Sequence, residues 1–216
     1  MNTLDSLIRY FETFPGVGAR QAKRFAFHVL RMGEADVKEF ARLIETIKQR
    51  VTECVSCHRY FANENVHTDT CSICSSSNRN HNRLLVVERD SDIQAIERAG
   101  VFDGLYFVLG GTVPLLNAKD NAKLRGGTLK GTVEARISQG LEEIILGFSI
   151  NPDGENTARF VESIIADLVT EHDIKISYLG RGLSTGSELE YADTETIKNA
   201  LQNRSWLSHL ITAKYC

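Results

Sequence analysis

Residues 84–109, LLVVERDSDIQAIERAGVFDGLYFVL, decide the fold of this 216-residue chain. The stretch opens with a short aliphatic run and closes with an apolar run, Leu105–Leu109, while Ser91–Ala99 between them is amphipathic. Apolar runs that alternate with amphipathic helices predict parallel strands covered on both faces. The same alternation continues through helices at Leu129–Gln139 and Glu155–Glu171 and strands at Ile144–Phe148 and Ile174–Leu179. We therefore expect an α/β domain with a parallel sheet.

The first 52 residues carry a helical pattern instead. Leu4, Leu7, Ile8 and Phe11 follow the spacing of one helical face, and the motif Phe14-Pro15-Gly16-Val17-Gly18 ends that helix, because Pro removes a donor and Gly permits a tight reversal. Two further helices are expected at about Ala19–Arg31 and Ala35–Val51. Their expected apolar faces are Ala22, Phe25, Ala26 and Val29 in the first, and Val37, Phe40, Ala41, Ile44 and Val51 in the second.

The hairpin around residue 16 predicts a contact with phosphate. Glycines between two helices let a backbone approach a phosphate, and the following helix presents its amides and positive dipole end. Acidic residues are absent from 14–32, and residues 1–50 hold nine Lys and Arg against six Asp and Glu. The candidate DNA-binding residues are Gly16, Gly18, Arg20, Lys23 and Arg24. Such a surface should bind DNA largely independently of sequence. The alternative is a two-helix packing hairpin with a solvated face.

Four of the five cysteines occupy twenty-one residues. Cys54 and Cys57 form one Cys-x-x-Cys pair, and Cys71 and Cys74 form another after thirteen intervening residues. Two such turns supply a tetrahedral thiolate shell for Zn²⁺ with no open position, so we expect one structural zinc ion per chain. The alternative is four unligated thiols. The surrounding segment has few aliphatic residues and needs such a staple to fold.

Polar residues follow two of the expected strands. Glu88 ends the first and Asp92 lies in the next helix, whereas Ser149 and Asn151 follow the strand at 144–148. This order resembles the Toprim domain, in which catalytic members hold Mg²⁺ with a Glu and an Asp-x-Asp. Here Ser149 and Asn151 stand at the Asp-x-Asp positions, and neutral ligands do little to offset the dehydration of Mg²⁺. We therefore expect no catalytic residue, and instead an acidic surface at Glu88 and Asp92 for a basic partner. The alternative is solvated helix-terminus charge.

Composition and hydropathy predict a cytosolic protein. The net charge is −3, a stretch of about 20 apolar residues is lacking, and Met1–Tyr10 has no signal-peptide core. The Gly-rich segment 180–187 lacks the Gly-Lys-Ser/Thr ending of a nucleotide-binding loop.

The complete order of motifs resembles the RecR family of recombination mediators. The resemblance rests on the hairpin, on Arg24–His28, on the cysteine pairs, and on the strings Val86-Val87-Glu88, Val108-Leu109-Gly110-Gly111, Gly154-Glu155-Asn156-Thr157 and Leu189-Glu190-Tyr191-Ala192-Asp193. It implies a multidomain α+β protein with a helix-hairpin-helix region (1–52), a four-cysteine zinc finger (53–80), a Toprim domain (81–179) and a C-terminal oligomerisation segment with a short helix (180–216). It also implies a ring-like oligomer, usually a tetramer, that acts with RecO and RecF to load RecA onto single-stranded gaps.

The chain departs from the family pattern at Ser184-Thr185-Gly186-Ser187 and at Arg79-Asn80. Two other functions stay open from the sequence. One is a small metal-dependent Toprim nuclease or primase-like enzyme, and the other is a zinc-stabilised interaction module without a nucleic-acid role.

Overall fold

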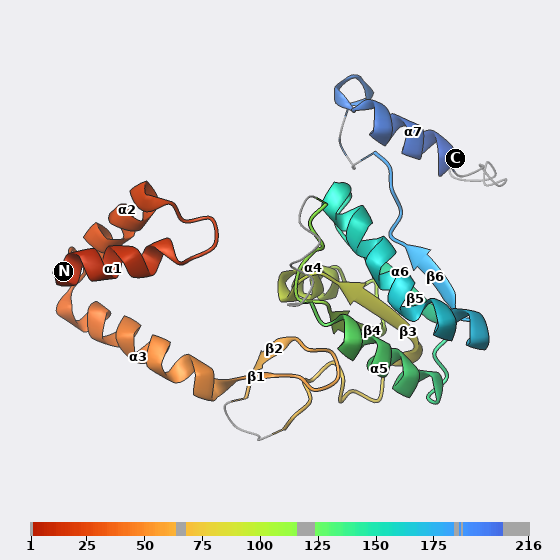
Figure 1. The fold of residues 1–216 in the computed structure, drawn as a ribbon, viewed down its shortest axis with the longest axis horizontal. Helices are drawn as coiled ribbons and strands as arrows, with labels where there is room; N and C mark the ends of the chain where they lie inside the picture. Colours follow the sequence, from red (N-terminus) through yellow and green to blue (C-terminus); the bar gives the residue numbers. More distant parts are fainter. Residues whose placement is uncertain (1, 64–67, 116–123, 184–185, 187, 205–216) are drawn as a thin grey trace, which may run out of the picture. The chain divides into compact units, whose positions relative to one another are not determined.

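The computed structural model describes residues 2–63, 68–115, 124–183, 186 and 188–204, and these form two compact units (Figure 1). The helical unit comprises Met1–Glu53 and Tyr60–Asp69, and the sheet unit comprises Cys54–Arg59 and Thr70–Cys216. The helical unit contains α1 (Thr3–Glu12), α2 (Ala19–Val29), α3 (Glu34–Arg50), β1 (Val51–Glu53) and β2 (Tyr60–Ala62). The sheet unit contains β3 (Asn80–Val87), α4 (Asp90–Ala99), β4 (Gly104–Val108), α5 (Gly126–Ile137), β5 (Glu143–Gly147), α6 (Pro152–His172), β6 (Lys175–Tyr178), a 3₁₀ turn (Leu189–Tyr191) and α7 (Thr194–Gln202).

In the helical unit, α1 and α2 form the expected hairpin. Asn2 caps α1 by accepting a hydrogen bond from the amide of Asp5, and Gly16 in the connecting turn adopts a φ of 75°. The side chains of α2 that are fully buried, Ala22 and Ala26, are small, so the two helices can approach closely. The ring of Phe11 packs edge-on against the ring of Phe25 at 5.7 Å between centroids. This hairpin presents α2 with one face packed and the other exposed.

Helix α3 differs from the sequence expectation. Phe40 and Ile44 of its expected apolar face are exposed, as are the neighbouring Leu43 and Ile47. The helix leads directly into a short antiparallel hairpin in which Val51 pairs with Ala62 and Glu53 with Tyr60. Sequence patterns did not predict this hairpin, because strands of three residues are too short to show alternation.

The sheet unit confirms the predicted parallel sheet. Its strand order is β4-β3-β5-β6, and every neighbouring pair is parallel. Right-handed crossovers with this order place α4 on one face and both α5 and α6 on the other. The core on the second face is formed by alternate strand residues and by apolar residues of the two helices, including Leu84, Val86, Leu105, Phe107, Ile144, Leu146, Leu129, Val133, Val161 and Ile165.

The connections of the sheet place chemistry at its carboxyl edge. Strands β3 and β5 are neighbours, with Val87 opposite Gly147, so the segments that follow both strands emerge side by side. Brief polar segments at this edge carry Glu88 and Ser149. Beyond β6 the chain continues to α7, and Ser184, Thr185, Ser187 and Cys216 lie outside the described residues.

Candidate functional site

The four cysteines of the two Cys-x-x-Cys pairs come together in the sheet unit. Their sulfur atoms all lie within 4.8 Å of one another. Cys54, Cys57 and Cys71 are buried, and Cys74 is half-buried. The sulfurs of Cys57 and Cys71 are 3.7 Å apart, which is far beyond a disulfide bond. The structure thus gathers the four predicted ligands.

The donor set fits a tetrahedral divalent metal ion. Zn–S bonds of about 2.3 Å place neighbouring sulfurs about 3.8 Å apart, close to the separation of Cys57 and Cys71. The amide of Cys71 donates a hydrogen bond to the sulfur of Cys54 at 3.3 Å, a contact that favours the thiolate form of Cys54. A stabilised thiolate is the form that binds metal. These residues could hold Zn²⁺, and four protein ligands leave no position for a substrate.

The turn that carries Cys54 and Cys57 is docked on the edge of the sheet. The carbonyl of Cys57 accepts a hydrogen bond from the amide of Val108 in β4 at 2.8 Å. The ring of His58, whose φ is 61°, packs edge-on against Phe107 at 5.2 Å between centroids. The turn therefore belongs to the sheet unit through both backbone and ring contacts.

The exposed face of α2 carries the predicted basic residues. Arg20, Lys23 and Arg24 are exposed, and within the described residues none of them forms an ion pair. A surface hollow of about 570 Å³ lies on this helix, and its lining residues are Gln21, Lys23, Arg24, Phe25, Phe27, His28 and Arg31. This face is an unneutralised cationic surface with an exposed aromatic ring, Phe27, within it.

The two glycines of the hairpin differ in what the fold requires of them. Gly16 needs its positive φ, whereas Gly18 has an ordinary φ of −85°. A Cβ at either position would meet no atom within 4 Å. Gly18 is the N-cap of α2, and it has no side chain to bind the first amides of the helix. Neither backbone strain nor internal packing explains glycine at 18, so the amide end of α2 is open to an external ligand.

The sheet edge brings Glu88 and Ser149 together, as their predicted positions required. The amide of Ser149 donates to Oε1 of Glu88 at 2.7 Å, and Glu88 is only 6% exposed. The side chain of Asn151 caps α6 by accepting from the amide of Gly154 at 2.8 Å. Asp92 accepts from the amide of Arg89 at 2.8 Å at the start of α4. The side chains of Glu88, Asn151 and Asp92 thus each have an internal partner.

The expectation of an exposed acidic surface needs correction at Glu88. Its carboxylate is only 6% exposed and accepts a hydrogen bond from the Ser149 amide in the β5–α6 connection, whereas the sequence predicted an exposed carboxylate. Asp92 is partly exposed, so it is the member of the pair that a partner could reach.

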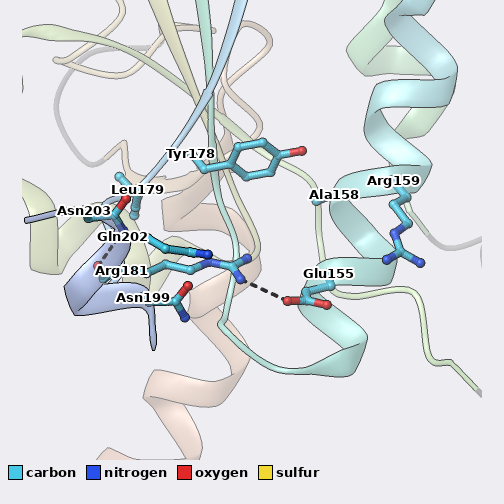
Figure 2. Close-up of a pocket in the computed structure, with 10 residues that line it drawn as sticks. Glu155, Ala158, Arg159, Tyr178, Leu179, Arg181, Asn199, Gln202 and Asn203 are labelled. Atoms are coloured by element: carbon cyan, nitrogen blue, oxygen red, sulfur yellow. Dashed lines mark hydrogen bonds and ion pairs between the residues drawn. The ribbon is translucent and has the colours of Figure 1, made fainter. Parts of the chain in front are cut away.

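A further hollow, which the sequence did not predict, lies between β6, α6 and α7 (Figure 2). Its volume is about 590 Å³, and Nη1 of Arg181 in its wall pairs with Oε1 of Glu155 at 3.0 Å. Asn203 donates to the carbonyl of Arg181 at 2.9 Å, which attaches the end of α7 to the Gly-rich segment. The signal in the sequence was an arginine between Gly180 and Gly182.

Arg79, which precedes the departure from the family pattern at Asn80, has a structural role of its own. Arg79 donates to the carbonyl of Phe102 at 3.0 Å and pairs with Glu97, which also accepts from Tyr106. Arg79 thus anchors the segment that follows the second cysteine pair to α4 and β4.

Among the helices of the described ranges, none combines the length and apolar character that crossing a membrane requires.

Comparisons with known proteins agree with this arrangement. Three family models match the chain: "RecR, helix-hairpin-helix" over residues 4–48, "Toprim domain" over 82–180 and "RecR, C-terminal" over 182–205. The chain is 34% identical over 202 residues to a recombination protein RecR of Lactobacillus helveticus, covering 93% of this chain and 96% of the relative. It is 33% identical over 202 residues to that of Staphylococcus aureus strain JH9, covering 94% and 96%. With the hairpin, the cysteine cluster and the parallel sheet in the same order, the chain belongs to the RecR family of recombination proteins.

Proposed function

We propose that this chain is a recombination mediator that binds DNA without sequence preference through the hairpin of the helical unit. The observation that carries the proposal is the exposed, unpaired cationic face of α2 next to the open amide end at Gly18. Arginine and lysine side chains that contact phosphates hold a protein on DNA without reading its bases, and helix amides add further donors. Phe27 is exposed in the same face, and we propose that its ring stacks on a base of a single strand.

The wider proposal is that the chain forms a ring-like oligomer, usually a tetramer in this family, that resides in the cytosol and acts with RecO and RecF in recombinational repair. In this scheme it helps to load RecA onto single-stranded gaps, as the family resemblance implies. The cysteine cluster holds one structural Zn²⁺ per chain, and the Toprim domain performs no catalysis.

A salt-titrated binding assay tests the DNA proposal. Fluorescence anisotropy with a labelled oligonucleotide should show affinity that falls steeply with salt, because bound cations release counterions from the phosphates. Lys23→Glu combined with Arg24→Glu should remove most of the binding. The matched control is Lys38→Glu with Arg42→Glu, which makes the same charge change on exposed positions of α3. Equal affinity of the Lys23/Arg24 variant and the control would refute the site.

Partner docking at the sheet edge is proposed through Asp92 alone, with Glu88 holding the neighbouring connection in place. Complementary charge at such a contact mainly sets association rate and specificity. Asp92→Lys should slow association with RecO, whereas Glu134→Lys, an exposed change on α5, should not. If Asp92→Lys associates with RecO at the same rate as the unmodified protein, Asp92 serves only as a cap of α4.

A further inference from the structure

The side chain of Arg136 is buried although it carries a charge. It lies in α5 and is 5% exposed. Leu129, Val133 and Arg136 follow the i, i+4, i+7 spacing of one helical face, and the first two belong to the core of the sheet unit. Burial lowers the pKa of the Arg136 guanidinium. A cation in such a position needs hydrogen bonds and a compensating negative charge.

Hydrogen bonds satisfy the guanidinium only in part. Nη2 donates to Oγ of Ser56 at 2.9 Å. The buried Nε has no hydrogen-bond partner among the described residues. The ion pairs formed within the described part of the chain do not include Arg136. Among the described residues, no carboxylate therefore balances this buried cation.

The cysteine cluster lies where the missing negative charge is needed. Ser56, the hydrogen-bond acceptor, stands between the ligands Cys54 and Cys57. Arg136 and Cys74 line the same hollow of about 470 Å³. Negative charge on Cys74, Cys57 and Cys54 acts on Arg136 in the direction opposite to burial. A divalent ion with four thiolate ligands has a net charge of about −2, so a neighbouring cation is electrostatically favoured.

We propose that Arg136 is the counter-cation of the metal–thiolate cluster. The guanidinium offsets the excess negative charge of the bound metal centre and, through Ser56, fixes the first metal-binding turn against α5. The inference rests on the metal site proposed above. Its consequence is that metal retention depends on a helix of the Toprim domain and not only on the four ligands.

Variants at position 136 test the inference. Arg136→Met keeps an unbranched side chain and removes the charge, and Arg136→Lys restores a cation. Arg98→Met, at an exposed position of α4, is the matched control. Elemental analysis measures the metal content of each variant. The absorbance of a chromophoric chelator then measures the rate at which the metal is released. We expect Arg136→Met to release metal about tenfold faster than the unmodified protein, because partners outside the ligand shell typically change retention by that factor or more. Arg136→Lys should be intermediate and Arg98→Met unchanged.

A second background separates charge from packing. Cys74→His removes one negative charge while keeping a four-ligand set that zinc accepts. If Arg136 acts through charge, Arg136→Met accelerates release less in the Cys74→His background than in the native one. If the methionine variant does not fold, Arg136→Gln, which also removes the charge but keeps hydrogen-bond donors, gives the same comparison in both backgrounds.

The outcomes distinguish the two proposals. If the unmodified protein, purified without chelators, contains no bound metal, the metal site itself is refuted. Metal-loaded protein whose release is unaffected by Arg136→Met would overturn only the counter-cation inference. Equal acceleration in both backgrounds would also overturn it, because packing, or an anion held in the hollow, would then explain the burial of Arg136.

Discussion

At residue 154 the chain has no room for a side chain. A Cβ on Gly154 would lie 1.9 Å from the carbonyl oxygen of Ser149, which is backbone and cannot rotate away. We predict that Gly154→Ala lowers the free energy of unfolding by about 3 kcal/mol or more, because the connection between β5 and α6 must move. Urea denaturation measures the change.

Gly131→Ala is the matched control for that substitution. It lies inside α5, and a Cβ there meets nothing within 4 Å. Alanine should therefore stabilise the protein by about 0.5–1 kcal/mol through helix propensity. Similar losses at 131 and 154 would show that the contact with Ser149 does not determine the outcome.

Removal of one metal ligand should also destabilise the sheet unit. Cys57→Ser removes the buried sulfur of a residue whose backbone carbonyl accepts a hydrogen bond from β4. Metal-binding energy contributes directly to folding, so the loss of this ligand also lowers stability. We predict that the variant loses its bound zinc and that its free energy of unfolding falls by roughly several kcal/mol, because the binding energy of the metal is lost from folding. Elemental analysis and thermal denaturation together measure this, and a zinc-free unmodified protein would contradict it.

Single residues show where sequence reasoning succeeded and where it stopped. The spacing of Cys54, Cys57, Cys71 and Cys74 predicted a cluster, because two Cys-x-x-Cys turns have few other arrangements that satisfy four thiols. The burial of Glu88 could not be predicted. A carboxylate at the end of a strand is usually solvated, and only the fold of the β5–α6 connection brings the Ser149 amide to it.

At the scale of elements, the cap of α7 makes that helix sensitive to acid. A hydrogen bond from the Thr196 hydroxyl, followed by one from its amide, holds the pKa of Asp193 below its ordinary value. Because the pKa is lower in the folded state, the carboxylate stabilises α7 above the unfolded pKa of about 3.9. That stabilisation is lost as the pH falls through the folded pKa.

We predict that Asp193→Ala increases hydrogen exchange at the amides of Glu195 and Thr196 at neutral pH, because both amides lose their acceptor. Asp193→Asn retains an acceptor oxygen and should protect them in part. A carboxyl NMR titration of the unmodified protein should place the Asp193 midpoint below that of an unstructured peptide. Unchanged exchange in Asp193→Ala would mean that the amides are protected by other contacts.

The helices and strands that sequence predicted are those with long or strongly periodic patterns. Strands β3 to β6 contain the predicted apolar runs, separated by helices, so their class and parallel direction followed from the alternation, whereas their order in the sheet did not. Helix α3 has the same periodicity, yet its apolar face is exposed. Periodicity identifies an apolar face but carries no information about what covers it.

At the scale of the whole molecule, we predict that the protein does not cleave, join or prime nucleic acid with Mg²⁺ or Mn²⁺. Glu88 is engaged by a backbone amide and Asn151 by the cap of α6, so neither is placed as a free metal ligand. Labelled DNA and RNA incubated with either ion should stay intact. Activity that is lost in Glu88→Gln, an isosteric change that retains an acceptor, would contradict this and support a Toprim nuclease.

The path of the chain between its two units has a topological consequence. The chain crosses from one unit to the other after Glu53, returns after Arg59 and crosses again after Asp69. Cys54 and Cys57 lie on the first excursion, and Cys71 and Cys74 follow the last crossing. With a metal ion bound, the segment between the cysteine pairs becomes a closed ring, so one backbone cut within residues 58–70 leaves both fragments joined through the ion. Chelation would then open the ring and separate the two fragments, so the metal acts as a reversible cross-link within the chain.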